Sequence, residues 1–183
     1  MSPAIRKRKR RRRSQLVLVI GGASSGKSAA ALDFAGKSTK RAFVATGEPL
    51  DEEMAERILR HRASRGGSWQ THEVPSDLVE WMKKHSQEYQ SIVIDCLTLW
   101  LSNLLGRGLA DPRISELVSD LLRAIRAATA RVVVVTNELG LGLVPMEVSA
   151  RRFRDLAGQV NQQVAAEADA VYFVMSGLPV RIK

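Results

Sequence analysis

The chain reads LVLVIGGASSGKS from Leu16 to Ser28, and this stretch decides its fold. Its first five residues are all apolar, which predicts a buried strand. The segment from Gly21 to Ser28 matches the pattern G-x-x-x-x-G-K-[ST], and residues 25–34 have helical character. A strand before this pattern and a helix after it form the context in which such a loop holds the phosphates of a nucleotide.

Each residue type in this loop has a chemical reason to be there. Glycines allow backbone N–H groups to converge on phosphate oxygens, and the following helix adds the positive end of its dipole. Lys27 can reach the β- and γ-phosphates, and the Ser28 hydroxyl can ligate Mg²⁺. The alternative is a Gly- and Ser-rich turn with an accidental lysine, and the flanking strand and helix favour the phosphate loop over it.

Strand and helix patterns alternate along the rest of the chain. We expect further strands over residues 42–45, 69–74, 92–94, 132–135, 171–175 and 180–182. We expect helices over residues 51–65, 76–85 and 150–167, with one or two more between the fourth and fifth strands. This alternation predicts an α/β fold with a mostly parallel sheet flanked by helices. The last two strands are too close for a crossover, so they should form a C-terminal antiparallel hairpin.

A carboxylate ends the strand that begins at Ser91. Asp95 stands where a second acidic partner of a phosphate loop is expected, and it would bind Mg²⁺ or orient a water molecule. Asp is also common at strand ends for structural reasons. The phosphate loop in the same chain favours the metal-binding interpretation.

A histidine lies near the end of the helix expected over residues 51–65. At 100° per residue, Met54, Ile58 and His61 share one stripe of this helix, so His61 would point inward. One interpretation is that a histidine among arginines near a helix C-terminus simply complements the helix dipole. The other is a nucleophile, because Arg62 and Arg65 would favour the neutral imidazole.

Charge and composition exclude several classes of protein. The chain has 183 residues and a net charge of +9, but residues 6–13 read RKRKRRRR, and without them 20 Lys and Arg face 19 Asp and Glu. We expect residues 1–14 to be a disordered basic arm and residues 15–183 a single catalytic domain. The arm is a solvated tail, a start codon assigned too early, or a segment attracted non-specifically to nucleic acid or anionic lipid. No aromatic residues interleave its arginines, so specific nucleic-acid binding is not indicated.

The single cysteine, Cys96, excludes an internal disulfide and a Cys-rich zinc site, and it favours the cytoplasm. No apolar run is long enough for a transmembrane segment.

Several motifs together are similar to one family, from Leu16 to the end of the chain. They comprise the phosphate loop, Ala45-Thr46, DEEM with Arg57-Ile58 and His61-Arg62, Trp69 with Thr71 and Glu73, DCLTLWLSNLL from Asp95, TNELGLGLVP from Thr136, RFRD from Arg152 with Gly158 and Asn161-Gln162, and Gly177-Leu178-Pro179. In this order and spacing the chain resembles the bifunctional adenosylcobinamide kinase / adenosylcobinamide-phosphate guanylyltransferase family of cobalamin biosynthesis.

The resemblance implies a RecA-like P-loop fold, a homotrimer and two reactions. The first phosphorylates adenosylcobinamide with ATP or GTP. The second transfers GMP from GTP to adenosylcobinamide phosphate through a guanylylated histidine, which would be His61. Implied nucleotide contacts are Gly21, Gly22, Ala23, Ser24, Ser25, Gly26, Lys27, Ser28, Ala45, Thr46, Gly47, Arg62, Ala63, Ser64, Arg65, Glu73 and Asp95. The apolar run Leu97–Leu105 would then face a neighbouring subunit or the corrinoid. Ser24 departs from the family, which usually has Arg at this position.

Two other functions remain as alternatives. A different small P-loop kinase would need the phosphate loop but not His61. A nucleic-acid-dependent RecA-like ATPase would use the basic arm and would show a steep salt dependence, although the near-neutral body argues against it.

Overall fold

The computed structural model describes residues 14–49, 51–63 and 67–183. The basic arm expected over residues 1–14 therefore lies, except for Ser14, outside the described residues. In the described part, no helix combines the length and the apolar character that crossing a membrane requires.

Seven strands form one sheet in the order β3-β2-β4-β5-β1-β6-β7. Their bounds are β1 (Leu16–Gly21), β2 (Arg41–Ala45), β3 (Gln70–Glu73), β4 (Ser91–Asp95), β5 (Arg131–Asn137), β6 (Ala170–Met175) and β7 (Leu178–Arg181). The pairings are parallel except for that of β6 with β7, which is antiparallel. The predicted mostly parallel sheet with a C-terminal hairpin is confirmed.

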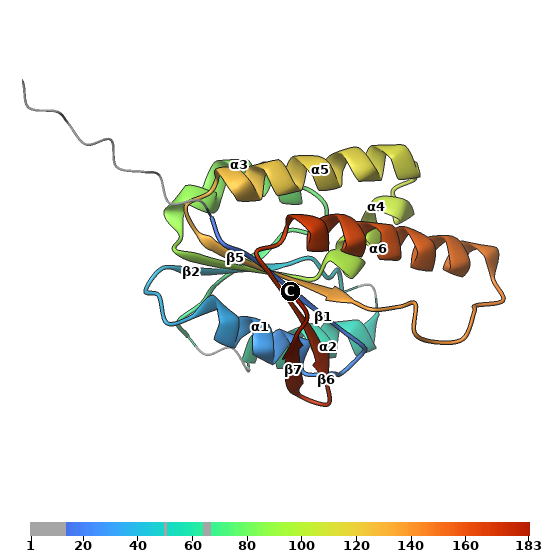
Figure 1. The fold of residues 1–183 in the computed structure, drawn as a ribbon, viewed down its shortest axis with the longest axis horizontal. Coiled ribbons are helices and arrows are strands. Elements are labelled where there is room, and N and C mark those ends of the chain that lie inside the picture. Colours follow the sequence, from blue (N-terminus) through green and yellow to red (C-terminus); the bar gives the residue numbers. More distant parts are fainter. Residues whose placement is uncertain (1–13, 50, 64–66) are drawn as a thin grey trace, which may run out of the picture.

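Helices cover both faces of this sheet (Figure 1). They are α1 (Lys27–Ala35), α2 (Glu52–Ala63), α3 (Leu78–His85), α4 (Leu97–Gly106), α5 (Asp111–Ala127) and α6 (Val148–Glu167), with a short 3₁₀ turn, η1, over Ser86–Glu88. α1 and α2 lie on one side of the sheet and α3 to α6 on the other (Figure 1). Between the fourth and fifth strands the chain forms two helices, α4 and α5.

Alternate residues of each central strand face opposite layers, as the pleat of a strand requires. In β1, Leu16, Leu18 and Ile20 pack in the larger core beneath α3 to α6, whereas Val17 and Val19 pack in the smaller core beneath α1. Both faces of the strand are therefore buried, which explains why the sequence shows a continuous apolar run instead of an alternating one.

The apolar run Leu97–Leu105 does not lie at an open surface as expected. It forms most of α4, and Leu97, Trp100, Leu101 and Leu104 are buried in the core of the chain itself. The indole N–H of Trp100 donates to the Ser76 carbonyl at 2.8 Å. The prediction of a subunit or corrinoid surface here is wrong, because an apolar helix packed on the sheet contributes its side chains to the core.

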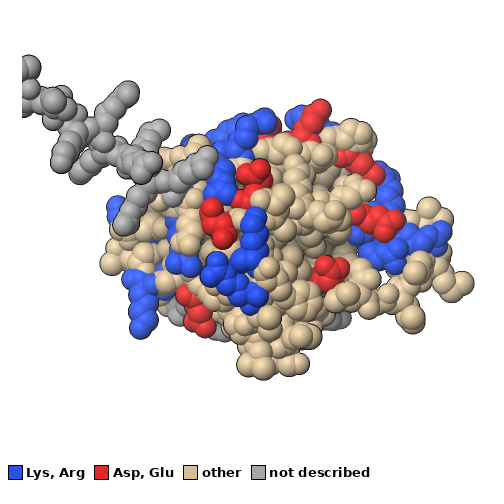
Figure 2. All heavy atoms as spheres, in the orientation of Figure 1, with Lys and Arg blue, Asp and Glu red and all other residues tan. Residues whose placement is uncertain are grey.

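The face of the molecule that Figure 2 shows carries no large patch of charges of one sign. Figure 2 shows Lys and Arg side chains interspersed with Asp and Glu over the helices, whereas the described surface near the β6–β7 hairpin carries few charges. This distribution agrees with the near balance of charges outside the arm.

Candidate functional site

The phosphate loop runs from the end of β1 to the start of α1, and its backbone needs glycine. A Cβ on Gly21 would lie 2.7 Å from the carbonyl oxygen of Val174, which is closer than a carbon atom can approach. Gly26 has a φ of 91° and directly precedes α1, in the left-handed region that glycine adopts without strain. Ser24 has a φ of 53°, so the loop contains two left-handed residues around Ser25.

Lys27 lies inside this loop. Its side chain is buried, and its Nζ donates to the carbonyl oxygen of Gly22 at 2.9 Å. The ammonium group is therefore held across the loop whose amides are expected to bind phosphates. Ser28 follows in the first turn of α1 and is half-buried. Both residues thus stand at the N-terminus of a nine-residue helix, where the dipole favours an anion.

Three of the predicted residues from different strands share one level of the sheet. Ala45, which ends β2, pairs with Glu73 of β3 on one side and with Asp95 of β4 on the other. Strand spacing places the Cα atoms of Glu73 and Asp95 about 10 Å apart. The strand β5 lies between β4 and β1 and ends at Asn137, which pairs with Gly21. The carboxyl edge of the sheet therefore brings the phosphate loop, Asp95 and Glu73 together.

Hydrogen bonds between Thr46 and Cys96 join the carboxyl ends of β2 and β4. The side chain of Thr46 is fully buried, its hydroxyl donates to the carbonyl oxygen of Cys96 at 2.7 Å, and it accepts from the Cys96 N–H at 2.8 Å. Asn103 of α4 donates to the Thr46 carbonyl oxygen at 2.7 Å. These bonds fix the backbone that follows Asp95. Contact between Thr46 and a nucleotide stays a prediction, and Gly47, the next residue, is half-buried.

Cys96, next to Asp95, is not suited to nucleophilic chemistry. Burial, together with the negative charge of Asp95, raises the pKa of its thiol to about 12. The thiolate form needed for attack is therefore scarce at neutral pH.

The donor set at this edge fits magnesium better than a metal held entirely by protein. Within residues 14–49, 51–63 and 67–183 there is no group of three or more His, Cys, Asp or Glu residues that could hold a metal ion. Mg²⁺ keeps several waters and usually takes one or two protein oxygens plus the phosphates of the substrate. The hydroxyl of Ser28 and the carboxylate of Asp95 are oxygen donors of the kind that Mg²⁺ takes, and their role as its ligands stays a prediction.

The helix α2 carries His61, Arg62 and Ala63 in its last turn. Arg62 forms an ion pair with Glu73, with 3.9 Å between Nη1 and Oε1. Both side chains are well exposed, so the pair adds little stability, but it shows that the end of α2 reaches the carboxyl end of β3. The side chains of His61 and Ala63, and all of Ser64 and Arg65, lie outside the described residues.

One group of polar residues at this edge was not assigned a role from the sequence. The Thr98 hydroxyl contacts that of Thr136 at 3.2 Å and accepts from the Asn137 N–H at 2.8 Å. The Asn161 side chain of α6 accepts from Thr136 at 2.8 Å and donates to the Asn137 carbonyl oxygen at 3.0 Å. This network ties α4, β5 and α6 together beside the phosphate loop. A polar pair at the end of a buried strand, as Thr136-Asn137 is in β5, was the signal that could have found it.

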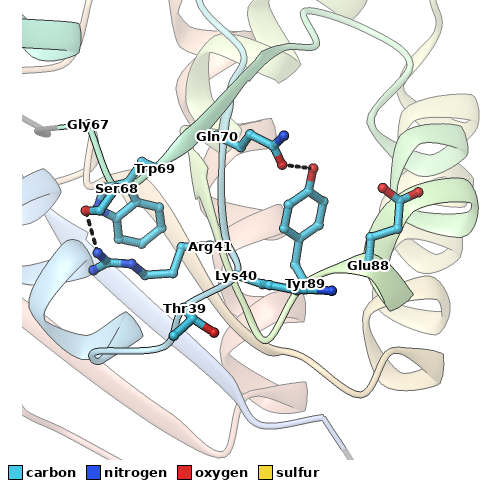
Figure 3. A pocket seen from close by; sticks show the side chains of 9 residues that line it. All are labelled: Thr39, Lys40, Arg41, Gly67, Ser68, Trp69, Gln70, Glu88 and Tyr89. Carbon is cyan, nitrogen blue, oxygen red and sulfur yellow. Dashed lines mark hydrogen bonds between the residues drawn. The ribbon is translucent and has the colours of Figure 1, made fainter.

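A separate pocket of about 510 Å³ lies at the opposite edge of the sheet. Figure 3 shows Arg41 against Trp69 on one side and Tyr89, bonded to Gln70, on the other. Arg41 and Gln70 begin β2 and β3, so this pocket is at the amino ends of the strands. It is remote from the phosphate loop and does not belong to the nucleotide site.

A second cavity, of about 640 Å³, adjoins Glu73 at the carboxyl end of β3. Its walls include Trp81, Lys84 and His85 of α3. Of the predicted nucleotide contacts, Glu73 is among its walls, and the cavity follows α3 as far as His85.

The chain is similar in sequence to proteins of one known family. Residues 17–182 match the family model described as cobinamide kinase / cobinamide phosphate guanyltransferase. The chain is 40% identical over 175 residues to the bifunctional adenosylcobalamin biosynthesis protein CobU of Escherichia coli (strain K12), covering 89% of this chain and 97% of that protein. It is 38% identical over 165 residues to the protein CobP of Pseudomonas aeruginosa, described in the same words, covering 89% of this chain and 94% of that protein.

Two solved structures share the fold. A KaiC-like protein of Pyrococcus horikoshii superposes with a TM-score of 0.51 at 14% identity, over 88% of this chain and 71% of that chain. The RadB recombinase superposes with a TM-score of 0.50 at 16% identity, over 88% of this chain and 74% of that chain. These structural similarities support the predicted RecA-like P-loop fold and no other property of the chain.

Proposed function

Because the chain belongs to the cobinamide kinase / cobinamide phosphate guanyltransferase family, we propose that it performs both reactions at one nucleotide site. It phosphorylates adenosylcobinamide, and it then transfers GMP from GTP to adenosylcobinamide phosphate. The observation that carries the proposal is the buried Lys27 within a phosphate loop, at the same sheet edge as Asp95 and Glu73. This edge offers one set of groups for a triphosphate.

In the kinase reaction, the hydroxyl oxygen of adenosylcobinamide attacks the γ-phosphorus of ATP or GTP. The bond from that phosphorus to the β-phosphate oxygen breaks, the nucleoside diphosphate leaves, and the hydroxyl proton passes to water. Lys27 and the loop amides offset the negative charge on the transferring group. Ser28 and Asp95 would hold Mg²⁺, which supplies further positive charge at the phosphates when bound.

In the guanylyl transfer, an imidazole nitrogen of His61 attacks the α-phosphorus of GTP and pyrophosphate leaves. An oxygen of adenosylcobinamide phosphate then attacks the same phosphorus. The phosphorus–nitrogen bond breaks, giving adenosyl-GDP-cobinamide and free His61. Support for this residue comes from the backbone of α2, whose last turn holds His61 next to Arg62, which is paired with Glu73. Glu73 would contact the nucleotide beside it.

We infer that the protein works as a homotrimer in the cytoplasm. A cyclic trimer uses heterologous contacts, in which one surface patch meets a different patch on the neighbour. Two exposed apolar segments could supply such patches: the loop after β5, where Leu143 is 97% and Met146 94% exposed, and the hairpin with Leu178 and Val180. Light scattering of the purified protein tests the mass, and Leu143→Ser should lower it. No specific nucleic-acid partner is proposed.

The guanylylated histidine is tested by labelling. Incubation with α-labelled GTP and Mg²⁺ should label the chain, and the adduct should be a phosphoramidate, labile in acid and stable in base. His61→Ala should abolish the label and GMP transfer while keeping some phosphorylation of adenosylcobinamide. His85→Ala is the control and should retain the label, since the half-buried ring of His85 contacts the Glu88 carboxylate at 2.9 Å and belongs to α3 instead of α2.

An acid-stable adduct, or a labelled His61→Ala protein, would assign the nucleophile to another residue. A chain that phosphorylates but never becomes labelled would be a simple P-loop kinase.

A further inference from the structure

The C-terminal hairpin reaches the phosphate loop from the far end of the chain. β6 lies next to β1, and Gly21, the last residue of β1, pairs with Val174. β6 continues past this point, and the turn Ser176-Gly177 then leads into β7. Residues 176 and 177 both have positive φ, at 49° and 81°, as a two-residue type I′ hairpin turn requires.

This turn makes a direct contact with the loop. The N–H of Gly177 donates to the carbonyl oxygen of Ser25 at 2.8 Å. A Cβ on Gly26 would lie only 3.0 Å from the Cα of Gly177. The loop and the turn therefore touch through backbone atoms, without a side chain between them.

The bond to Ser25 fixes the direction of a second group. The carbonyl of Ser25 and the N–H of Gly26 belong to the same peptide unit, which is planar and trans. In such a unit the two groups point in opposite directions. Holding the Ser25 carbonyl toward the hairpin therefore turns the Gly26 N–H away from the hairpin.

We propose that Gly177 is a positioning residue for nucleotide binding: through the Ser25 carbonyl, its N–H aims the Gly26 N–H at the triphosphate. The hairpin turn then acts on the phosphate loop without touching the nucleotide. This inference rests on the proposed use of a triphosphate at this loop.

The chain offers a matched pair of variants for the test. Gly177 and Gly108 have nearly the same φ, 81° and 80°, and a Cβ at either would meet nothing within 4 Å. Valine strains both backbones alike. Gly108 follows α4 and bonds to Leu105 instead of to the loop. Asn tolerates positive φ better than valine does, so Gly177→Asn should keep the turn and its N–H in place and is the conservative replacement.

The experiment measures binding of the non-hydrolysable analogue guanosine 5′-(β,γ-imido)triphosphate with Mg²⁺ by calorimetry, without cobinamide. Gly177→Val should weaken binding about tenfold, as expected for loss of one hydrogen bond to a charged group. Gly177→Asn should bind within about twofold of the wild type, and Gly108→Val should bind as the wild type does. Should Gly177→Val not fold, Gly177→Ala replaces it, with an expected loss of about threefold.

Wild-type affinity in the strained Gly177 variant, or an equal loss in folded Gly108→Val, overturns the inference and leaves the proposed function standing. A wild-type protein that does not bind the analogue overturns both.

Discussion

Replacing Thr46 with valine should destabilise the protein and disturb its nucleotide site together. Valine keeps the shape of threonine but leaves the N–H and the carbonyl of Cys96 without the hydroxyl that now bonds both, at 2.8 and 2.7 Å. An unpaired buried backbone group costs about 1–3 kcal/mol. The Cys96 carbonyl still accepts from the N–H of Trp100 at 3.2 Å, so the Cys96 N–H is the group that loses its partner. We therefore predict a loss of about 1–3 kcal/mol in the free energy of unfolding.

Urea denaturation followed by circular dichroism measures this loss. Thr46→Ser is the control, since it keeps the hydroxyl and removes one buried methyl group, at a cost of about 1 kcal/mol. Because Asp95 directly precedes the peptide that Thr46 holds, Thr46→Val should also reduce the rates of both transfers while the protein is still folded. A valine variant no less stable than the serine variant would refute the role of the two hydrogen bonds.

Three further outcomes are expected. Lys27→Ala should slow both reactions by about 10²- to 10³-fold, as loss of a preorganised charged donor does; Lys37→Ala is the control, and a wild-type rate in either reaction would require a second nucleotide site. Removing residues 2–13 should leave both rates largely intact at moderate salt, because every motif begins at or beyond Leu16; a large loss in a folded truncated protein would contradict this. Burial, followed by the neighbouring His85, lowers the pKa of His72 below its usual 6.5, so the unfolded chain takes up the proton first as pH falls. Stability should be full above pH 6.5 and should decline as pH falls below that value toward the folded pKa. Urea unfolding at about pH 7.5 and about pH 5.5 measures this decline in the free energy of unfolding. The decline should be smaller in His72→Gln, and an equal decline in that variant would contradict the prediction.

The expected elements were largely correct because their signals are local. A continuous apolar run such as residues 132–135 indicates a strand buried on both faces, and the short separation of β6 from β7 requires an antiparallel hairpin. The signal for the phosphate loop was equally local, since glycine, lysine and serine at this fixed spacing after a strand have few other functions. The error over Leu97–Leu105 arose because hydrophobicity alone does not distinguish a helix of the core from one at an interface.

The candidate site was predicted residue by residue, but its arrangement was not. Asp95 and Glu73 were chosen from their motifs, and only the pairing of both strands with β2 places them on either side of Ala45. Nothing in the sequence indicated that the Thr46 hydroxyl bonds to Cys96, and the contact of Thr46 with a nucleotide stays a prediction. Side-chain hydrogen bonds between distant segments leave no periodic trace in a sequence.

The sequence by itself determined the layered α/β architecture, the phosphate loop with Lys27 and Ser28, and the family, because each depends on neighbouring residues or on short spaced motifs. Only the tertiary structure decided the strand order, the level shared by Glu73, Ala45 and Asp95, and the contact of Gly177 with Ser25. The physical reason is that backbone amides and carbonyls are the same in every residue except proline. Which amides and carbonyls contact each other across the fold depends on strand register and sheet twist. Neither the register nor the twist can be read from the types of residue that make the contact.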